Sequence, residues 1–281
     1  MSLTKKYALI GYPLGYSLSP ALHNHFFKTN HLDAQYTSTP LTPDQIKTFI
    51  ESKEFEGFNV TIPYKEIVFP LLDEITDAAN KIGAINTVKK IDNKYIGTNT
   101  DYEGFLLMLK EEKGVNLYNK NVLLFGAGGA AKAIAYALFQ KNIKSLFLYD
   151  IDINMSNTLS AKYPEKNITI LNSTSDLSTI LPQIDLLINS TPLGMEKTLD
   201  KSVLEKQQLA LLPKSCLVVD IIYAPLQTKL LKMANELGLN TLNGLGMLAG
   251  QGIKGQEFWF GKRLSYQEAK NIMLKALQST T

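Results

Sequence analysis

Arginine is almost absent from this chain of 281 residues. All but one of its 29 basic side chains are lysines, and Arg263 carries the only guanidinium group. A guanidinium group can hold a carboxylate or phosphate through two parallel hydrogen bonds, whereas a lysine acts as a point charge. The sequence therefore excludes a protein that grips several anionic groups with arginine side chains. Any anion that it binds must rely on hydroxyl groups, backbone N–H groups or lysines.

Cysteine and histidine are also scarce, which limits covalent and metal chemistry. Cys216 is the single cysteine, so an intrachain disulfide is excluded, and its position beside the largely apolar run 217–222 predicts that it is buried. His23 and His25 are two residues apart, a spacing that places them on different faces of a helix. With His31 as the only other histidine, we predict that the chain holds no metal ion.

Long apolar runs and an excess of one charge are missing as well. The N-terminus lacks the apolar segment of a signal peptide, and no run approaches the roughly 18 residues of a membrane span. A net charge of +3 over the whole chain is not the electrostatic footprint of a nucleic-acid-binding protein. We therefore expect a cytoplasmic protein, monomeric or homodimeric, that binds neither nucleic acid nor membrane.

The composition that remains is that of an ordinary globular protein. It is 45% apolar and 20% charged, which is typical of folded domains and not of disordered or fibrous chains. At roughly 100–200 residues per domain, the length predicts about two domains. Strand and helix patterns alternate along the chain, so the predicted fold class is α/β.

The first hundred residues contain short strands between helices. Ser19 and Pro20 are typical of a helix start, with the serine as N-cap and the proline in the first turn. Asp92 and Asn93 indicate the tight turn of a hairpin. The expected strands are 7–10, 35–39, 58–61, 84–90 and 94–98, and the expected helices are 19–30, 42–53 and 73–81.

The second half has continuous apolar strands between helices, the pattern of a parallel sheet covered on both faces. The expected strands are 121–125, 145–149, 168–171, 186–189 and 217–221, and helices are expected over 102–113, 131–141 and much of the chain from about 245. We predict an N-terminal α/β domain of residues 1–101 and a doubly wound, Rossmann-like domain of residues 102–244.

A glycine-rich motif lies between the strand 121–125 and the helix that follows it. Gly126, Gly128 and Ala131 fit the pattern G-x-G-x-x-A, in which the first glycine makes a tight turn and the second lets a pyrophosphate approach the backbone. The small third residue allows the helix to pack closely on the strand, and the helix N-terminus offers free N–H groups. The predicted dinucleotide-binding residues are Gly126, Ala127, Gly128, Gly129, Ala130 and Ala131.

The residue that ends the next strand bears on the choice of dinucleotide. Asp150 follows Gly126 by 24 positions (150 − 126), close to the spacing of about 20 for an acid that binds the adenosine ribose. A carboxylate there accepts hydrogen bonds from the 2′-hydroxyl group and repels a 2′-phosphate, so NAD is favoured and NADP remains the alternative. Asp150 could instead only cap the helix that begins near Asp152.

Small polar residues cluster where strands of the first half give way to loops. Together with the glycine motif, these segments resemble the shikimate dehydrogenase family, which includes quinate/shikimate dehydrogenases. The segments that carry the resemblance are 11–20, 59–65, 83–87, 99–101, 126–131, 220–223 and 243–251. The resemblance implies NAD(P)-dependent, reversible reduction of 3-dehydroshikimate to shikimate, a step toward chorismate and the aromatic amino acids.

The resemblance also implies roles for individual residues. Lys65 and Asp101 match the catalytic pair. The positions that match the substrate pocket are Ser17, Ser19, Thr61, Lys65, Asn86, Asp101, Tyr223 and Gln251. Besides the glycine motif and Asp150, those that match the cofactor site are Asp77, Asn189, Thr191, Ile221 and Gly244. Because Gln251 belongs to the substrate pocket, we expect the helices of 245–281 to complete the first domain.

The residue types fit this chemistry. Hydride transfer to a ketone builds negative charge on oxygen, and Lys65 can supply both a proton and a positive charge. Serine hydroxyl groups such as those of Ser17 and Ser19 can hold a carboxylate where arginine is missing, and amides suit ring hydroxyl groups. Without the motif, Lys65 would be read as a solvated surface lysine. Asp101 could cap the helix 102–113 in addition to a catalytic role.

One feature separates this chain from many members of the family, and a second agrees with the enzymes that prefer shikimate. Those members carry an arginine after the second strand of the nucleotide domain, where this chain has Asp150 and Ile151, as in the NAD-using quinate/shikimate branch. Ser19, however, is the residue expected of enzymes that prefer shikimate. We predict shikimate as the better substrate, with quinate activity, a related enzyme for another small acid and a non-catalytic nucleotide sensor as alternatives. Intact Lys65 and Asp101 argue against the sensor.

Overall fold

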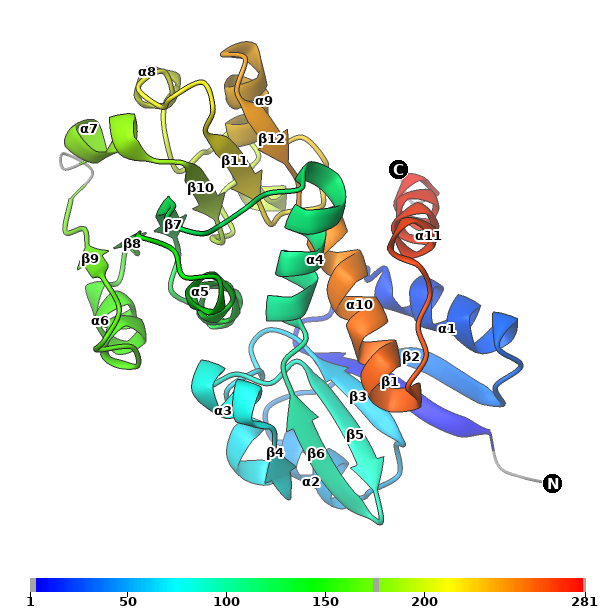
Figure 1. Cartoon of the computed structure of the whole chain (residues 1–281). Coiled ribbons are helices and arrows are strands. Elements are labelled where there is room, and N and C mark those ends of the chain that lie inside the picture. Colours follow the sequence, from blue (N-terminus) through cyan, green and yellow to red (C-terminus); the bar gives the residue numbers. More distant parts are fainter. Residues whose placement is uncertain (1–3, 174–176, 280–281) are drawn as a thin grey trace. The chain divides into compact units, whose positions relative to one another are not determined.

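The computed structural model describes residues 4–173 and 177–279 of the chain (Figure 1). The chain forms two compact units: unit 1 comprises residues 1–111 and 248–281, and unit 2 comprises residues 112–247. It passes from unit 1 into unit 2 within helix α4 (Asp101–Lys113) and returns within helix α10 (Leu245–Phe260). Unit 1 is therefore built from both ends of the chain and unit 2 from its middle.

A mixed sheet forms the centre of unit 1, and within the described residues it has six strands in the order β2-β1-β3-β5-β6-β4. The strands are β1 (Lys5–Gly11), β2 (Ala34–Pro40), β3 (Gly57–Val60), β4 (Glu74–Ile75), β5 (Thr87–Ile91) and β6 (Lys94–Thr98). Strand β5 runs antiparallel to its neighbours β3 and β6. Asp92 and Asn93 join β5 to β6 with φ angles of 48° and 61°, so the predicted hairpin is confirmed.

One helix from the C-terminal part of the chain packs on this sheet. Trp259 of α10 is only 4% exposed and its indole Nε1 donates to the carbonyl of Val88 on β5 at 2.8 Å. Its ring lies 5.1 Å from that of Tyr7 on β1, so Trp259 is a core residue. The other helices of unit 1 are α1 (Ser19–Thr29), α2 (Gln45–Glu51), α3 (Asp77–Ile82), α11 (Tyr266–Gln278) and the 3₁₀ turn η1 (Phe69–Leu71).

Unit 2 contains a parallel sheet, whose six described strands follow the order β12-β11-β10-β7-β8-β9. The strands are β7 (Asn121–Phe125), β8 (Ser145–Tyr149), β9 (Ile168–Ile170), β10 (Leu186–Asn189), β11 (Leu217–Asp220) and β12 (Asn240–Leu242). The helices are α5 (Gly129–Gln140), α6 (Ile153–Ala161), α7 (Leu177–Ile180), α8 (Lys206–Leu209) and α9 (Lys229–Glu236), with 3₁₀ turns η3 (Leu181–Gln183) and η4 (Glu196–Thr198).

The order of these strands locates a ligand site on unit 2. The chain winds outward from β7 through β8 to β9, and then from β10 through β11 to β12. In sheets of this kind, ligands bind beyond the carboxyl ends of the strands where the winding direction switches, here between β7 and β10. Cys216 is fully buried in the core of this unit, and burial raises its pKa to about 12, so its predicted packing role is confirmed.

Some local expectations differ from the structure. Strands β4 and β12 were not expected, and β4 lies within the segment 73–81 that was expected to be helical, so that α3 begins only at Asp77. Strand β5 begins at Thr87 and not at residue 84. The N-cap of α1 is Leu18, and Ser19 is the first helical residue. The reason is that the Ser17 hydroxyl oxygen, two residues upstream, accepts the Ser19 N–H at 3.2 Å, so Ser19 is not the cap and its side chain is free for another contact.

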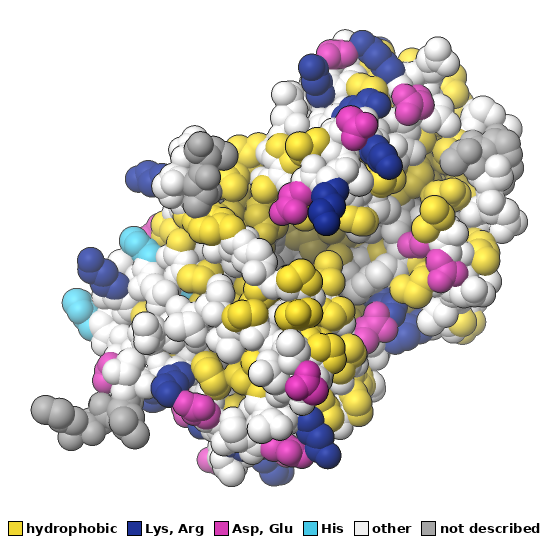
Figure 2. Space-filling view, turned by 180° about the vertical axis from the view of Figure 1, so that it is seen from behind, with side chains coloured by type: hydrophobic (Ala, Val, Ile, Leu, Met, Phe, Trp, Pro, Cys, Tyr) yellow, Lys and Arg dark blue, Asp and Glu magenta, His cyan; other side chains and the backbone are white. Residues whose placement is uncertain are grey.

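The surface and the helix lengths bear on the expected partners. Figure 2 shows lysine side chains interspersed with aspartate and glutamate over the face in view. In the part of the chain that the structure describes, no helix is both long and apolar enough to cross a membrane. Arg263 is exposed and lies 3.6 Å from Glu257, so the single arginine is a surface residue.

Candidate active site

Lys65 and Asp101 form an ion pair in unit 1. Lys65 lies in the turns that follow β3, and Asp101 is the first residue of α4. The Lys65 Nζ donates to Asp101 Oδ2 at 2.5 Å, and the two side chains are 18% and 8% exposed. Lys65 is therefore not a solvated surface lysine. Asp101 is the first helical residue, and its N–H donates to the side-chain oxygen of Asn99 at 3.0 Å.

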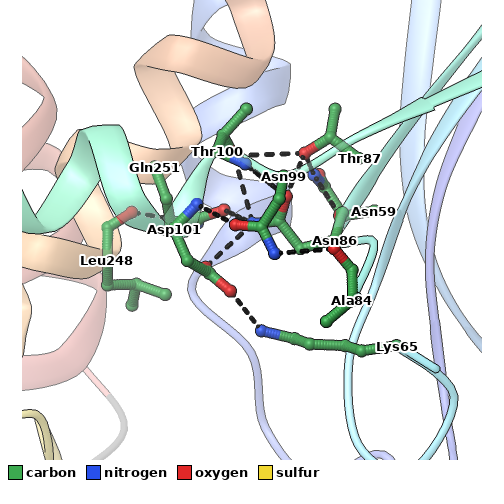
Figure 3. Close-up of polar contacts among 10 residues, drawn as sticks. All are labelled: Asn59, Lys65, Ala84, Asn86, Thr87, Asn99, Thr100, Asp101, Leu248 and Gln251. Atoms are coloured by element: carbon green, nitrogen blue, oxygen red, sulfur yellow. Dashed lines mark hydrogen bonds and ion pairs between the residues drawn. The ribbon is translucent and has the colours of Figure 1, made fainter. Parts of the chain in front are cut away.

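Asn86 and Gln251 extend this pair into a polar cluster (Figure 3). The Asn86 Nδ2 donates to Asp101 Oδ1 at 2.8 Å and lies 3.4 Å from Gln251 Oε1. Gln251 stands on α10, and its Nε2 donates to the Leu248 carbonyl at 3.0 Å. The structure thus brings four of the predicted site residues together from the two separate chain segments of unit 1.

The two predicted serines lie at the start of α1. Ser17 is half-buried, and Ser19 is 5% exposed with its hydroxyl in a hydrogen bond to the phenol of Tyr36. Burial raises the pKa of Tyr36 well above its ordinary value, so this phenol stays protonated. Thr61 is half-buried and directly follows β3. These three residues add hydroxyl groups to unit 1.

The glycine loop of unit 2 has the geometry that its sequence predicted. Gly126 has a φ of 99°, and its N–H donates to the Tyr149 carbonyl at 2.8 Å. A Cβ atom at this position would lie 2.6 Å from Ser190 Oγ. Gly128, the N-cap residue of α5, has a φ of −74° and open space where a Cβ atom would stand. Ala131 is 1% exposed against the sheet.

Asp150 fastens the end of β8 to this loop. Its Oδ2 accepts the Ala127 N–H at 2.7 Å, and its Oδ1 accepts the Asp152 N–H at 2.9 Å. The N-cap residue of α6 is Asp152, whose side chain accepts the Asn154 N–H. The alternative that Asp150 only caps this helix is therefore wrong. Ile151, between the two acids, is 95% exposed.

A buried carboxylate holds two loops at the carboxyl ends of β10 and β11. Asp220 is fully buried, and its oxygens accept from Asn189 Nδ2 at 3.1 Å and from Thr228 Oγ1 at 2.7 Å. Burial raises the pKa of Asp220 to about 6. The Thr191 hydroxyl donates to Asn189 Oδ1 at 2.7 Å. The sequence analysis did not predict this role of Asp220. The only signal for it in the sequence is an acidic residue at the end of an apolar strand.

Three further predicted residues lie on loops or at a helix start. Gly244 packs against the residue after β11, because a Cβ atom there would lie 1.8 Å from the Ile221 carbonyl oxygen. Tyr223 is half-buried in the same loop, and burial raises its pKa. Asp77 belongs to unit 1, where it begins α3 and pairs with Lys81 at 2.8 Å.

The predicted residues therefore fall into two sets. Those in unit 1 are Ser17, Ser19, Thr61, Lys65, Asp77, Asn86, Asp101 and Gln251. Those in unit 2 are Gly126, Ala127, Gly128, Gly129, Ala130, Ala131, Asp150, Asn189, Thr191, Tyr223, Ile221 and Gly244. Among the described residues, no group of three or more histidine, cysteine, aspartate or glutamate side chains could hold a metal ion.

The loop around Gly128 fits a dinucleotide. A glycine N-cap has no side chain with which to satisfy the N–H groups of the first turn of α5, and the space in front of it is open. A helix N-terminus of this kind carries a partial positive charge and donors that suit a pyrophosphate. The carboxylate of Asp150 lies beside it, within hydrogen-bonding reach of the loop backbone. Unit 2 is therefore a dinucleotide-binding domain of the Rossmann type.

Comparison with known proteins identifies the family. A model described as the shikimate dehydrogenase substrate binding domain matches residues 9–88, and one described as shikimate / quinate 5-dehydrogenase matches residues 108–227. The chain belongs to the shikimate dehydrogenase family of oxidoreductases. A curated relative from Clostridium perfringens strain 13, named shikimate dehydrogenase (NADP(+)), is 40% identical over 272 residues, which are 95% of this chain and 97% of the relative.

Two solved structures of similar proteins contain ligands. A shikimate dehydrogenase in complex with NADP+ has a TM-score of 0.88 at 35% identity, with 97% of this chain and 96% of that chain covered. The shikimate 5-dehydrogenase of Listeria monocytogenes, in complex with shikimate and NAD, has a TM-score of 0.88 at 28% identity, with 96% of each chain covered. Both nicotinamide dinucleotides thus occur among proteins of this fold.

Proposed function

We propose that this chain catalyses the reversible reduction of 3-dehydroshikimate to shikimate with a nicotinamide dinucleotide. The observation that carries the proposal is the pair of Lys65 and Asp101, which is mostly buried and is joined by Asn86 and Gln251. A lysine held at a carboxylate among neutral amides is a suitable proton donor and cation for a carbonyl oxygen. The glycine loop of unit 2 supplies the site for the dinucleotide.

Lys65 and Asp101 are the proposed catalytic residues. When bound, the nicotinamide ring supplies the hydride to the substrate carbon. Lys65 gives a proton to the carbonyl oxygen and stabilises the negative charge that develops there. Asp101 keeps the lysine ammonium group in place through its 2.5 Å contact. In the oxidation of shikimate the lysine accepts the proton from the same oxygen.

The remaining polar residues of unit 1 and one of unit 2 would bind the substrate. Hydroxyl groups of Ser17 and Ser19 donate to its carboxylate, in keeping with the scarcity of arginine. Thr61, Asn86 and Gln251 bind ring hydroxyl groups, and Tyr223 is the proposed contact from unit 2. We assign residues 1–101, with the helices of 245–281, to substrate binding, and residues 102–244 to the cofactor.

NAD is the cofactor that we propose, with NADP as the alternative that the names of the relatives suggest. Each oxygen of Asp150 accepts one backbone N–H, and because a carboxylate oxygen has two lone pairs it can still accept from a ribose hydroxyl group. Asp152 adds a second negative charge, and Ile151 between them carries none. Arg263, the only arginine, pairs with Glu257.

The resemblance to the family assigns further residues to the cofactor. Backbone N–H groups of Gly128, Gly129, Ala130 and Ala131 would hold the pyrophosphate, and Gly126 and Ala127, whose N–H groups bind Tyr149 and Asp150, would shape the loop. Asp77, Asn189, Thr191, Ile221 and Gly244 are the other proposed cofactor residues. We propose shikimate and not quinate as the substrate, because the curated relatives at 35–40% identity are named for shikimate. We further propose that the enzyme works in the cytoplasm as a monomer or homodimer.

Steady-state kinetics with shikimate and quinate, each with NAD and with NADP, tests the proposal. We expect the highest kcat/KM with shikimate and NAD. No turnover with any pair would refute the enzymatic function, and a strong preference for NADP would refute the argument from Asp150. A double variant, Asp150→Ser with Ile151→Arg, should shift the preference toward NADP, because it removes a carboxylate and adds a guanidinium group.

A further inference from the structure

A chain of hydrogen bonds runs through the buried part of unit 1 and ends at Asp101. The Tyr36 hydroxyl donates to Asn59 Oδ1 at 2.7 Å, and Asn59 Nδ2 donates to Thr87 Oγ1 at 2.9 Å. The Thr87 hydroxyl lies 3.0 Å from Asn86 Oδ1, and Asn86 Nδ2 donates to Asp101 Oδ1 at 2.8 Å. Figure 3 shows this series of hydrogen bonds from Asn59 to Asp101. Tyr36, Asn59, Thr87 and Asn86 are each at most 5% exposed.

Backbone groups fix the orientation of both amides in this chain. Asn59 Nδ2 also lies 3.1 Å from the Asn86 carbonyl oxygen, which can only accept. The backbone N–H of Thr100 lies 2.7 Å from Asn86 Oδ1 and can only donate. The Asn59 amide nitrogen must therefore face Thr87, and the Asn86 amide nitrogen must face Asp101.

The direction of the Thr87 hydroxyl follows from these two amides. Its oxygen accepts from Asn59 Nδ2, so its single proton is available for an acceptor. Asn86 Oδ1 is an acceptor at 3.0 Å, and Thr100 Oγ1 is the other neighbour, at 3.1 Å. Every donor from Tyr36 to Asn86 can thus point toward the carboxylate, an arrangement in which successive hydrogen bonds strengthen one another.

We propose that Thr87 is a positioning residue for the reaction, acting through Asn86 on the Asp101 carboxylate. Thr87 has 0% exposure and so cannot touch the substrate. Its hydroxyl group is one of the donors that hold the Asn86 amide, whose opposite end fixes the orientation of Asp101 and thereby of Lys65. The inference rests on the proposed function, because it concerns the geometry of the same catalytic pair.

The test replaces the hydroxyl group of Thr87 while the shape of the side chain is kept. In Thr87→Val, Asn59 Nδ2 loses one acceptor and Asn86 loses one donor, so we expect kcat for shikimate oxidation to fall about tenfold, the effect of one hydrogen bond. KM for shikimate should change less than threefold. In Thr87→Ser the hydroxyl group remains, and kcat should return to within about twofold of the wild type.

Thr98→Val is the matched control. Thr98 pairs with Thr87 across β5 and β6, is 9% exposed, and its hydroxyl oxygen accepts from Thr76 Oγ1 at 2.9 Å, outside the chain to Asp101. Urea unfolding followed by the fluorescence of Trp259, the single tryptophan and part of unit 1, should show similar destabilisation in both valine variants. Only Thr87→Val should lose kcat.

Each outcome bears on one hypothesis. If the wild type does not oxidise shikimate with either cofactor, the proposed function fails. If the wild type is active and Thr87→Val keeps the kcat of Thr98→Val, or Thr87→Ser fails to restore it, the positioning role is refuted. If Thr87→Val does not fold, Tyr36→Phe takes its place, because it removes the first donor of the chain. An unchanged kcat in that variant overturns the inference.

Discussion

Gly128 and Gly126 lie in one loop, but their alanine variants should have opposite effects. Gly128→Ala should weaken cofactor binding and leave stability nearly unchanged, whereas Gly126→Ala should destabilise the fold. Gly128 has a φ of −74° and no atom within 4 Å of the position where its Cβ atom would stand. Alanine fits this backbone, and because it lowers the conformational entropy of the unfolded chain it stabilises the folded protein by about 0.4–1 kcal/mol. Alanine is a poorer N-cap than glycine, which destabilises the helix by a similar amount. We therefore expect Gly128→Ala to change the free energy of unfolding by less than about 0.5 kcal/mol.

The same substitution should weaken cofactor binding strongly. The added methyl group would occupy the open space in front of the first turn of α5, where a pyrophosphate would approach the backbone. Loss of one charge-assisted hydrogen bond, worth about 1.5–3 kcal/mol, raises KM for the dinucleotide by about tenfold to 150-fold. Initial rates at saturating shikimate measure this KM, and urea unfolding followed by far-ultraviolet circular dichroism measures stability.

Gly126→Ala is the matched control in the same loop. Its φ of 99° strains an alanine, and the Cβ atom would lie 2.6 Å from Ser190 Oγ. We expect the free energy of unfolding to fall by about 2 kcal/mol or more. The reasoning would be refuted if Gly128→Ala unfolded like Gly126→Ala, or if it kept the wild-type KM for the dinucleotide.

Two further predictions concern one charged residue in each unit, Lys65 in unit 1 and Asp220 in unit 2. Lys65→Met should lower kcat about a hundredfold or more with a smaller change in KM, because the proton donor is lost while most substrate contacts remain. If steady-state kinetics show a change mainly in KM, Lys65 binds the substrate but does not take part in catalysis. Burial raises the pKa of Asp220 to about 6, so between its ordinary value and pH 6 the folded chain holds a proton that the unfolded chain has released. The stability of the wild type should therefore fall, relative to Asp220→Asn, by about 2–3 kcal/mol as pH rises from 4 to 6.5. This prediction is wrong if the free energy of unfolding in urea has the same pH dependence in the wild type and in Asp220→Asn.

Residues with a strong local preference were predictable from the sequence. Asp92 and Asn93 predicted the hairpin because these residue types tolerate positive φ. Gly126 and Gly128 predicted the dinucleotide loop between strand and helix. Long apolar strands such as 186–189 were placed correctly because their burial in a parallel sheet requires an unbroken apolar run. The α/β class and the Rossmann-type domain followed from these features.

Other features depend on contacts between distant residues or on very short elements. Strands β4 and β12 have two and three residues, too few to show a periodic pattern. Ser19 looked like an N-cap because serine before proline favours that position, whereas in the structure the helix begins one residue earlier, with Leu18 as the N-cap. Thr87 lay in a segment that we had noted, but its partner Asn59 is 28 residues away, and only the pairing of β3 with β5 brings the two side chains together.

The way in which unit 1 is assembled from both ends of the chain has a consequence for synthesis. A ribosome synthesises all of unit 2 before residues 248–281, which complete unit 1. Trp259 and the rest of α10 reach the sheet of unit 1 only then, and Gln251 joins Asn86 and Asp101 at the same stage. Every residue of the nucleotide-binding fold is therefore already part of the growing chain at a time when the polar cluster around Lys65 and Asp101 still lacks Gln251.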